Sequence, residues 1–186
     1  MLKARNKDLL LELLRSAIQT CYDQDYTLIE RNMERASVSR IFLYMHDLIQ
    51  TDSRFEVFKD YNLDCEYNKN GENRKWTPRC KKGTSPDLIL HKRRFYDVPQ
   101  TEDTNLLVVE FKSAKGRFRY FDKNTEKTKY KKETNIDKEV DFVKLEDFTN
   151  QEIYNYFLGV FVRLKKDKPE YIYFQKGKKS AVGIKK

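Results

Sequence analysis

Two short motifs in the middle of the chain place charged side chains beside apolar runs. Asp87 follows a proline and precedes the apolar run 88–90, while Glu110 and Lys112 close the strongest strand pattern of the chain, residues 105–112. Because successive side chains of a strand face opposite ways, Glu110 and Lys112 are expected on one face. A carboxylate and an ammonium at the end of a buried strand are seldom fully buried unless they are paired or bound to a metal. The pattern therefore indicates a polar site at this end of the strand.

Two carboxylates that converge from neighbouring strands can hold a hard divalent cation. Mg²⁺ prefers oxygen ligands and keeps several of its waters, so Asp87 and Glu110 suit it. Such a cation lowers the pKa of a bound water and neutralises charge growing on a phosphate, and a lysine such as Lys112 can orient that water or stabilise the transition state. Each motif alone is common on exposed strands. Their combination, with strand context at both motifs and a basic segment directly after them, favours phosphodiester hydrolysis over an ordinary exposed strand.

The composition favours a folded chain of one domain. Its 186 residues suit one hydrophobic core, and although 36% of them are charged, 13% are aromatic, which is unusual for a disordered chain. No apolar run approaches the roughly 18 residues of a membrane span, so no membrane association is expected. The charged start, residues 1–8, lacks the apolar block of a secretory signal, which predicts a cytoplasmic protein. Three cysteines without a CxxC pair and two histidines give little support to a disulfide framework or a structural zinc site.

The net charge of +9 favours a polyanionic partner, and nucleic acid is the class that it suggests. Most of the excess lies in residues 113–132, which contain eight basic and two acidic side chains. The basic side chains expected to contact nucleic acid are Lys92, Arg93, Arg94, Lys115, Arg117, Arg119, Lys129 and Lys131. The plain alternative is a soluble protein with a surplus of lysines.

Hydrophobic periodicity predicts an α/β or α+β domain with a mixed sheet flanked by helices. Apolar residues at helical spacing predict helices over residues 2–21 and 38–52, and a third over about 136–148 in which Glu139, Asp141 and Lys144 belong to the polar side. The other predicted elements are strands over 63–67, 87–90 and 105–112, a hairpin over 157–164 and 171–174, a loop over 70–85 and a loose tail over 176–186. In the strand 63–67, the alternation predicts that Leu63 and Cys65 face the core.

The two motifs together resemble the signature of the PD-(D/E)xK nuclease superfamily, which has the restriction-endonuclease-like fold. The matching segments are Ser85-Pro86-Asp87-Leu88-Ile89-Leu90-His91 and Asn105-Leu106-Leu107-Val108-Val109-Glu110-Phe111-Lys112. The chain looks most similar to small bacterial and phage-type members, in which a helix with a Glu-Arg pair, here Glu34-Arg35, precedes the first strand. In those members another helix, here 141–145, follows the lysine. The resemblance covers residues 34–174.

The patterns and the resemblance together predict a single nuclease-like domain over residues 1–175, with a helical N-terminus over 1–52 and a sheet core over 61–175, followed by a basic flexible tail over 176–186. The resemblance implies that Asp87 and Glu110 are metal ligands, that Lys112 is the catalytic lysine, and that Glu34 is a further acid on the preceding helix. The implied activity is Mg²⁺-dependent cleavage of nucleic acid, with Mn²⁺ able to substitute; DNA is favoured over RNA as the substrate, but the sequence does not decide between them. Glu66 and His91 are weaker candidates for supporting roles beside the metal.

Two other interpretations stay open at this point. One is a non-catalytic nucleic-acid-binding or regulatory module that retains the nuclease fold, although a module that only binds has no need for carboxylates that repel phosphate. The other is a protein-binding inhibitor or adaptor that uses tyrosine and phenylalanine surfaces. For the nuclease, cutting both strands of a duplex with one small domain would favour a homodimer.

Overall fold

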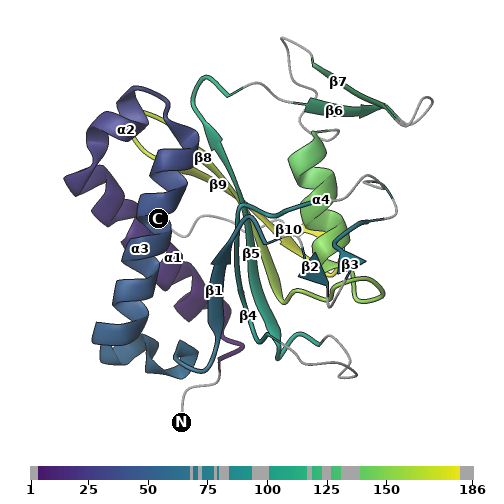
Figure 1. Cartoon of the computed structure of the whole chain (residues 1–186), viewed down its shortest axis with the longest axis horizontal. Helices are drawn as coiled ribbons and strands as arrows, with labels where there is room; N and C mark the ends of the chain where they lie inside the picture. Colours follow the sequence, from purple (N-terminus) through teal and green to yellow (C-terminus); the bar gives the residue numbers. More distant parts are fainter. Residues whose placement is uncertain are drawn as a thin grey trace.

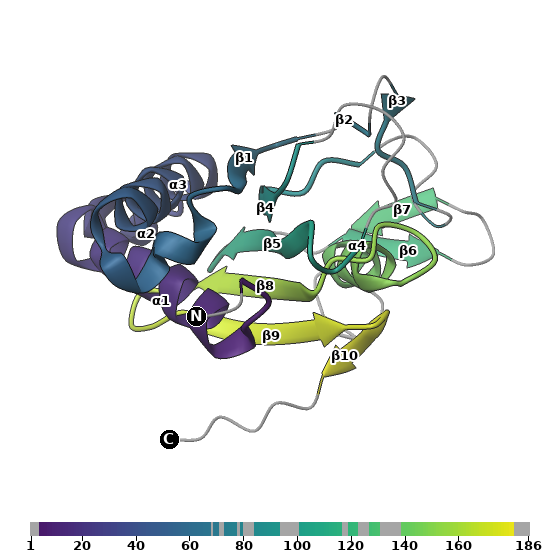
Figure 2. The ribbon, with the colours of Figure 1, turned by 90° about the horizontal axis from the view of Figure 1, so that it is seen from below.

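A six-stranded mixed sheet lies at the centre of the molecule, with helices on both of its faces (Figure 1). This computed structural model describes residues 4–67, 69–70, 73–77, 79, 84–93, 101–116, 119–122, 127–130 and 139–180. The strands in spatial order are β1 (Asn62–Cys65), β4 (Leu88–His91), β5 (Asn105–Ser113), β8 (Leu158–Leu164), β9 (Glu170–Gln175) and β10 (Lys178–Ser180), an order that can be followed in Figure 2. The β5–β8 pair is parallel and the other pairs are antiparallel. The predicted mixed sheet flanked by helices is confirmed.

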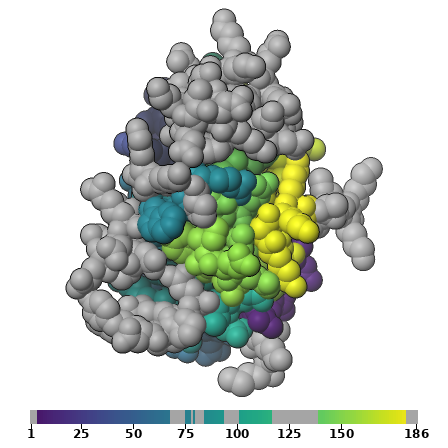
Figure 3. All heavy atoms as spheres, turned by 90° about the vertical axis from the view of Figure 1, so that its right-hand side faces the viewer, coloured from purple at the N-terminus to yellow at the C-terminus, as the bar shows by residue number. Residues whose placement is uncertain are grey.

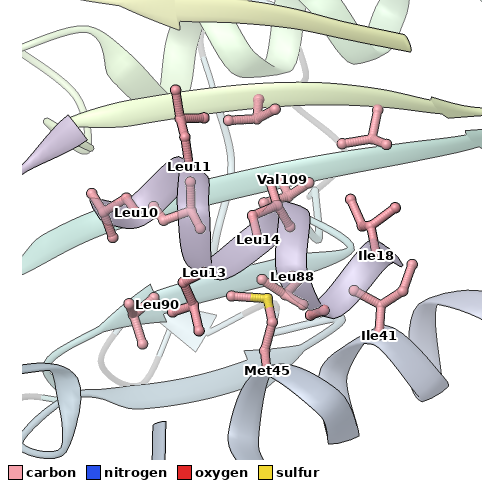
Figure 4. Packing of buried hydrophobic residues seen from close by; sticks show 14 of the residues in the cluster. Leu10, Leu11, Leu13, Leu14, Ile18, Ile41, Met45, Leu88, Leu90 and Val109 are labelled. Atoms are coloured by element: carbon pink, nitrogen blue, oxygen red, sulfur yellow. The ribbon is translucent and has the colours of Figure 1, made fainter. Parts of the chain in front are cut away.

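Two long helices cover one face of the sheet because each carries an apolar stripe. These helices are α1 (Lys7–Gln24) and α3 (Glu34–Thr51), and their buried leucines and isoleucines join the sheet in one hydrophobic cluster. Figure 4 shows how Leu14 of α1, Met45 of α3 and Val109 of β5 meet in this cluster. Both helices were predictable from their stripes. The stripes do not predict the short helix α2 (Tyr26–Glu30) or the 3₁₀ helix η1 (Ser53–Phe58) that also belong to this layer.

The opposite face of the sheet is covered by α4 (Val140–Thr149), the green helix of Figure 1, whose atoms belong to the green surface beside the yellow C-terminal residues in Figure 3. Its aromatic residues pack against the sheet, and the ring of Phe142 meets that of Phe161 edge-on at 4.8 Å between centroids. Every residue of α4 except Glu146 is buried. The expectation that Asp141 and Lys144 form an ordinary polar side is therefore wrong, because both lie inside the molecule.

All nine residues of β5 are buried, as expected for a strand covered on both faces. Two small hairpins lie outside the central sheet. One joins β2 (Lys69–Asn70) to β3 (Asn73–Arg74) within the segment predicted as a loop, and the other joins β6 (Arg119–Asp122) to β7 (Lys127–Tyr130). Among the described helices, none combines the length and the apolar character that crossing a bilayer requires.

Two sequence-based expectations fail at the edges of the sheet. In β1 Leu63 packs against the hydrophobic cluster as predicted, but the buried side chain is Asp64 and Cys65 is exposed, so the expectation for Cys65 is wrong. The reason is that Asp64 has a hydrogen-bond partner in His91 of β4 and an ion-pair partner in Arg93 just beyond that strand, and both offset the cost of its burial. In the tail predicted to be loose, Lys178–Ser180 instead form β10, which pairs with β9. Residues 181–186 lie outside the described part of the chain.

Candidate active site

A pocket of about 500 Å³ lies at the carboxyl end of β5. Its walls come from the first turns of α3, the end of β1, the residue before β4, the end of β5 and the first turn of α4. Asp87, Glu110, Lys112 and Glu34, the four residues predicted to be catalytic, all line it. The fold therefore brings together side chains that are far apart in the sequence.

Asp87 reaches the pocket because β4 and β5 are antiparallel neighbours with Leu88 opposite Val109. This register places the residue before β4 beside Glu110. The backbone N–H of Phe111 donates a hydrogen bond of 2.6 Å to Oδ2 of Asp87 and fixes the carboxylate. Burial raises the pKa of Asp87 to about 6, although the hydrogen bond from Phe111 opposes the shift.

Glu110 is almost fully buried in the pocket, with 1% of its surface exposed. Nζ of Lys144 donates a hydrogen bond of 3.0 Å to its Oε2 atom, while its Oε1 atom has no hydrogen-bond partner among the described residues. Burial raises the pKa of Glu110 well above its ordinary value, and Lys144 only partly offsets this effect. A buried carboxylate with one free oxygen suits a cation as its second partner.

Lys112 lies two residues beyond Glu110 on the same face of β5. Its Nζ atom forms an ion pair of 2.9 Å with Oδ2 of Asp141. Burial lowers the pKa of Lys112, but the charge and hydrogen bond of Asp141, together with the nearby carboxylates of Glu34 and Glu139, outweigh burial, so the pKa lies above its ordinary value. Lys112 is therefore a protonated lysine held at the wall of the pocket.

Gly116 makes room for the stem of Lys112. A Cβ atom at this position would lie 2.5 Å from Cδ and 2.8 Å from Cγ of Lys112, which is closer than such atoms approach in real structures. We expect Gly116→Ala to displace this side chain and to lower the free energy of unfolding by about 1–3 kcal/mol, as overpacking does. Urea denaturation measures the loss. In a Lys112→Ala background, where the crowded atoms are missing, the same change should cost much less; an equal loss in both backgrounds would contradict this packing.

Glu34 ties α3 to the end of β5. Its Oε2 atom accepts a hydrogen bond of 2.6 Å from the backbone N–H of Ser113. Glu34, the further acid that the resemblance implies on the preceding helix, thus lies at the pocket. Glu66 also lines the pocket, but it is exposed, and Arg35 lies 3.9 Å from one of its oxygens.

Three charged residues near the start of α4, expected on its polar side, are instead buried at or beside the pocket. Asp141 and Lys144 line the pocket, and Glu139 caps the helix by accepting a hydrogen bond of 3.1 Å from the backbone N–H of Asp141. Burial, together with the nearby charge of Asp141, raises the pKa of Glu139 to about 8. The available signal was the spacing of Asp141 and Lys144, which puts opposite charges on one face of a helix.

His91 is not among the residues that line the pocket, because it points to a different polar cluster. Its Nε2 atom lies 2.9 Å from Oδ2 of Asp64, and Arg93 forms an ion pair with the same carboxylate. Burial lowers the pKa of His91 below its ordinary value, although Asp64 opposes this shift. His91 and Arg93 therefore share Asp64 as their structural partner.

The other basic residues predicted to contact nucleic acid are described only in part. Lys92 and Lys115 are exposed, and Nζ of Lys92 lies 4.8 Å from the ring centroid of Tyr61. Arg119 and Lys129 belong to β6 and β7, but their side chains are outside the described part of the structure. Arg94, Arg117 and Lys131 lie outside the described residues altogether.

The Asp64 cluster gives a prediction about acid stability. Hydrogen bonds from His91 and Arg93 outweigh burial and lower the pKa of Asp64 to about 2. Because this value lies below that of the unfolded chain, the stabilisation is complete above about pH 4 and is lost as the pH falls towards 2. We expect Asp64→Asn to cost about 2 kcal/mol at pH 7 and much less at pH 2.5, measured by urea denaturation. A pH-independent cost would contradict this account.

The pocket offers carboxylate oxygens to a metal, but it does not contain a complete set of protein ligands. Within the part of the chain that the structure describes, no group of three or more His, Cys, Asp or Glu side chains is arranged to hold a metal ion. Mg²⁺ commonly takes only one or two carboxylates and fills its other positions with water or substrate phosphate. Asp87 and the free Oε1 atom of Glu110 fit that pattern.

Comparisons with known proteins do not assign the chain to a family. No family model matches the sequence, and no curated protein matches it at a significant level. Support for a function therefore comes from the pocket and from the motifs that line it.

Proposed function

We propose that this protein is a Mg²⁺-dependent nuclease of the PD-(D/E)xK type with a restriction-endonuclease-like fold. The observation that carries the proposal is the position of Asp87, Glu110 and Lys112 in one pocket, where one buried oxygen of Glu110 has no hydrogen-bond partner within the described part of the chain. The mixed sheet with helices on both faces supports the fold assignment at the level of architecture.

The charge of the pocket supports a cation site. Five of its lining residues are acidic, namely Glu34, Glu66, Asp87, Glu110 and Asp141, and three are basic, namely Arg35, Lys112 and Lys144. Carboxylates in such excess around one pocket, with Glu110 and Asp141 buried, take up protons or a cation, and the raised pKa values of Asp87 and Glu110 express this tendency. Cation binding would replace these protons.

Each proposed catalytic residue has a distinct task. Asp87 and Glu110 would hold the metal, Glu110 through Oε1, because Lys144 occupies Oε2. Mg²⁺ bound there would supply a water of lowered pKa and would neutralise charge on the scissile phosphate. The protonated Lys112 would orient the attacking water or stabilise the negative charge that develops on the phosphate.

The proposed substrate is nucleic acid, with DNA preferred to RNA. The net charge of +9 and the exposed Lys92 and Lys115 support a polyanion as the partner. A binding-only module remains the second candidate, and one observation favours it. Both lysines of the pocket already form ion pairs with carboxylates, so the network is held together without a metal.

Cleavage assays with and without metal separate the two candidates. The full chain is incubated with single- and double-stranded DNA and RNA in Mg²⁺, in Mn²⁺ and in EDTA. We expect cleavage in either metal and none in EDTA. Binding without cleavage under all conditions would reject the nuclease and favour the module.

We expect the basic segment after β5 to supply phosphate contacts. Replacing Arg117, Arg119, Lys129 and Lys131 by alanine should reduce the slope of log Kobs against log salt concentration by about 3 to 4, because each phosphate contact contributes about 0.9. Fluorescence anisotropy at several salt concentrations measures this slope. Lys166 and Lys168, exposed lysines on the β8–β9 connection, provide a control variant in which the slope should stay unchanged. An unchanged slope in the fourfold variant would assign the segment to solubility alone.

A further inference from the structure

A chain of ion pairs joins the start of α4 to the end of β5. Lys112 pairs with Oδ2 of Asp141 at 2.9 Å, Oδ1 of Asp141 pairs with Lys144 at 3.2 Å, and Lys144 pairs with Oε2 of Glu110 at 3.0 Å. Positive and negative groups alternate along this chain. It begins and ends on two residues of β5 that have catalytic roles in the proposed function.

The geometry leaves Lys112 little freedom. A lysine side chain has a flexible stem that normally samples many rotamers in water. Here 9% of Lys112 is exposed, the stem lies against Gly116, and Asp141 holds the ammonium group at the end of the stem. The contact with Gly116 fixes where the stem runs, and the contact with Asp141 fixes where the charge lies.

The attachment of α4 to the rest of the molecule does not depend on Asp141 alone. Arg79 pairs with Glu146 at 2.8 Å and also with Asp147 on the same helix. The aromatic residues Phe142 and Phe148 anchor the helix in the hydrophobic cluster on this face. The helix therefore has anchors besides Asp141, and the buried carboxylate of Asp141 is compensated by Lys112 and Lys144, the two lysines of the pocket.

We propose that Asp141 is a positioning residue that holds the catalytic Lys112 in place, and that Lys144 links Asp141 to the metal ligand Glu110. This inference rests on the proposed nuclease function. Neither Asp141 nor Lys144 needs to touch the reacting phosphate. Their effect reaches the reaction through the location of Lys112 and through the orientation of Glu110, whose Oε1 atom stays available while Oε2 is occupied.

A kinetic double-mutant cycle tests the inference. Asp141→Asn keeps the shape of the side chain and removes its charge, so kcat should fall by about 10- to 100-fold, the usual effect of losing a supporting group, with little change in KM. Asp141→Glu, which keeps the charge, should recover part of this loss. In a Lys112→Met background, Asp141→Asn should cost less than twofold further, because its effect acts through the missing lysine. Glu146→Gln, on the same helix but outside the pocket, is the matched control and should keep the parent rate.

A spectroscopic measurement on the metal-free protein gives an answer that does not depend on cleavage. The ammonium group of Lys112 should give a protected ¹⁵Nζ resonance in the parent and in Glu146→Gln, and this signal should be lost or broadened in Asp141→Asn. Thermal denaturation checks that each variant is folded. If the parent cuts no substrate, the proposed function fails, while the Lys112 resonance still decides whether Asp141 holds the lysine. An unchanged resonance in Asp141→Asn, or equal losses of kcat in both backgrounds, would overturn the positioning role.

Discussion

Alanine in place of Asp87 or Glu110 is expected to lower Mg²⁺-dependent cleavage by about 10³-fold or more, a loss of about 4 kcal/mol of transition-state stabilisation. The two carboxylates are the proposed metal ligands, and each variant leaves the cation with one protein ligand. Affinity for nucleic acid should stay the same or rise, because each substitution removes a negative charge that faces the phosphate. Cleaved and bound fractions of one labelled substrate are scored separately.

Two further variants separate the loss of the metal from a loss of folding. Glu110→Ala leaves Lys144 without one of its partners in a buried position, so the fold itself could suffer. Glu110→Gln keeps the shape and an acceptor for Lys144 but lacks the negative charge that a cation needs. Asp47→Ala, on the exposed side of α3, removes a carboxylate far from the pocket and should cut like the parent. A Glu110→Gln variant with the parent rate would show that Glu110 is not a metal ligand.

The parts of the structure that could be predicted from the sequence are those with local patterns. The stripes of α1 and α3 have helical spacing, and the unbroken apolar run of β5 reflects a strand that is covered on both faces. The position of Glu110 and Lys112 on one face of β5 follows from the two-residue repeat of a strand. The closing hairpin was also visible, because Pro169 and several charged residues separate two apolar runs.

The parts that could not be predicted depend on partners that are distant in the sequence. Asp64 was expected on the solvent side of its strand, and it is buried because His91 and Arg93 compensate its charge. Lys75 belongs to a polar segment, yet 3% of it is exposed, and its Nζ atom donates a hydrogen bond of 3.1 Å to the hydroxyl of Tyr156. Burial lowers the pKa of Lys75 to about 7. Hydrophobic periodicity assigns charged residues to the exposed side of an element, so it misses charged side chains that are buried against partners distant in the sequence.

The same reasoning explains why α4 was predicted as a helix but not as a wall of the pocket. Its apolar residues gave the helical stripe, and the intervening charges were assigned to water. In the structure, Asp141 pairs with Lys112 and Lys144 pairs with Glu110 of β5. Within each pair, the two opposite charges offset each other's cost of burial. A pair of opposite charges on one helical face, close in the chain to an ExK strand, is the pattern that would have indicated this wall.

Lys112→Ala is expected to separate catalysis from metal binding. Because Lys112 is proposed to act on the attacking water and on the charge of the transition state, its loss should lower kcat by about 10²- to 10³-fold and change substrate affinity little. Asp87 and Glu110 stay in place, so Mn²⁺ should still bind, as measured by calorimetry on the metal-free variant. Asp141 keeps Lys144 as a partner at 3.2 Å, which limits the cost to folding.

Two other variants test whether the expected loss of cleavage is specific to Lys112. Lys168→Ala removes an exposed lysine on the β8–β9 connection and should keep kcat close to that of the parent. Asp87→Ala should lose both cleavage and Mn²⁺ binding, whereas Lys112→Ala should lose cleavage alone. A Lys112→Ala variant that cuts as fast as the parent would remove the lysine from the mechanism and with it the PD-(D/E)xK assignment. Because the ion pair with Asp141 would then have no catalytic use, the buried charges of α4 and β5 would be a structural network, as expected for a module that binds nucleic acid without cutting it.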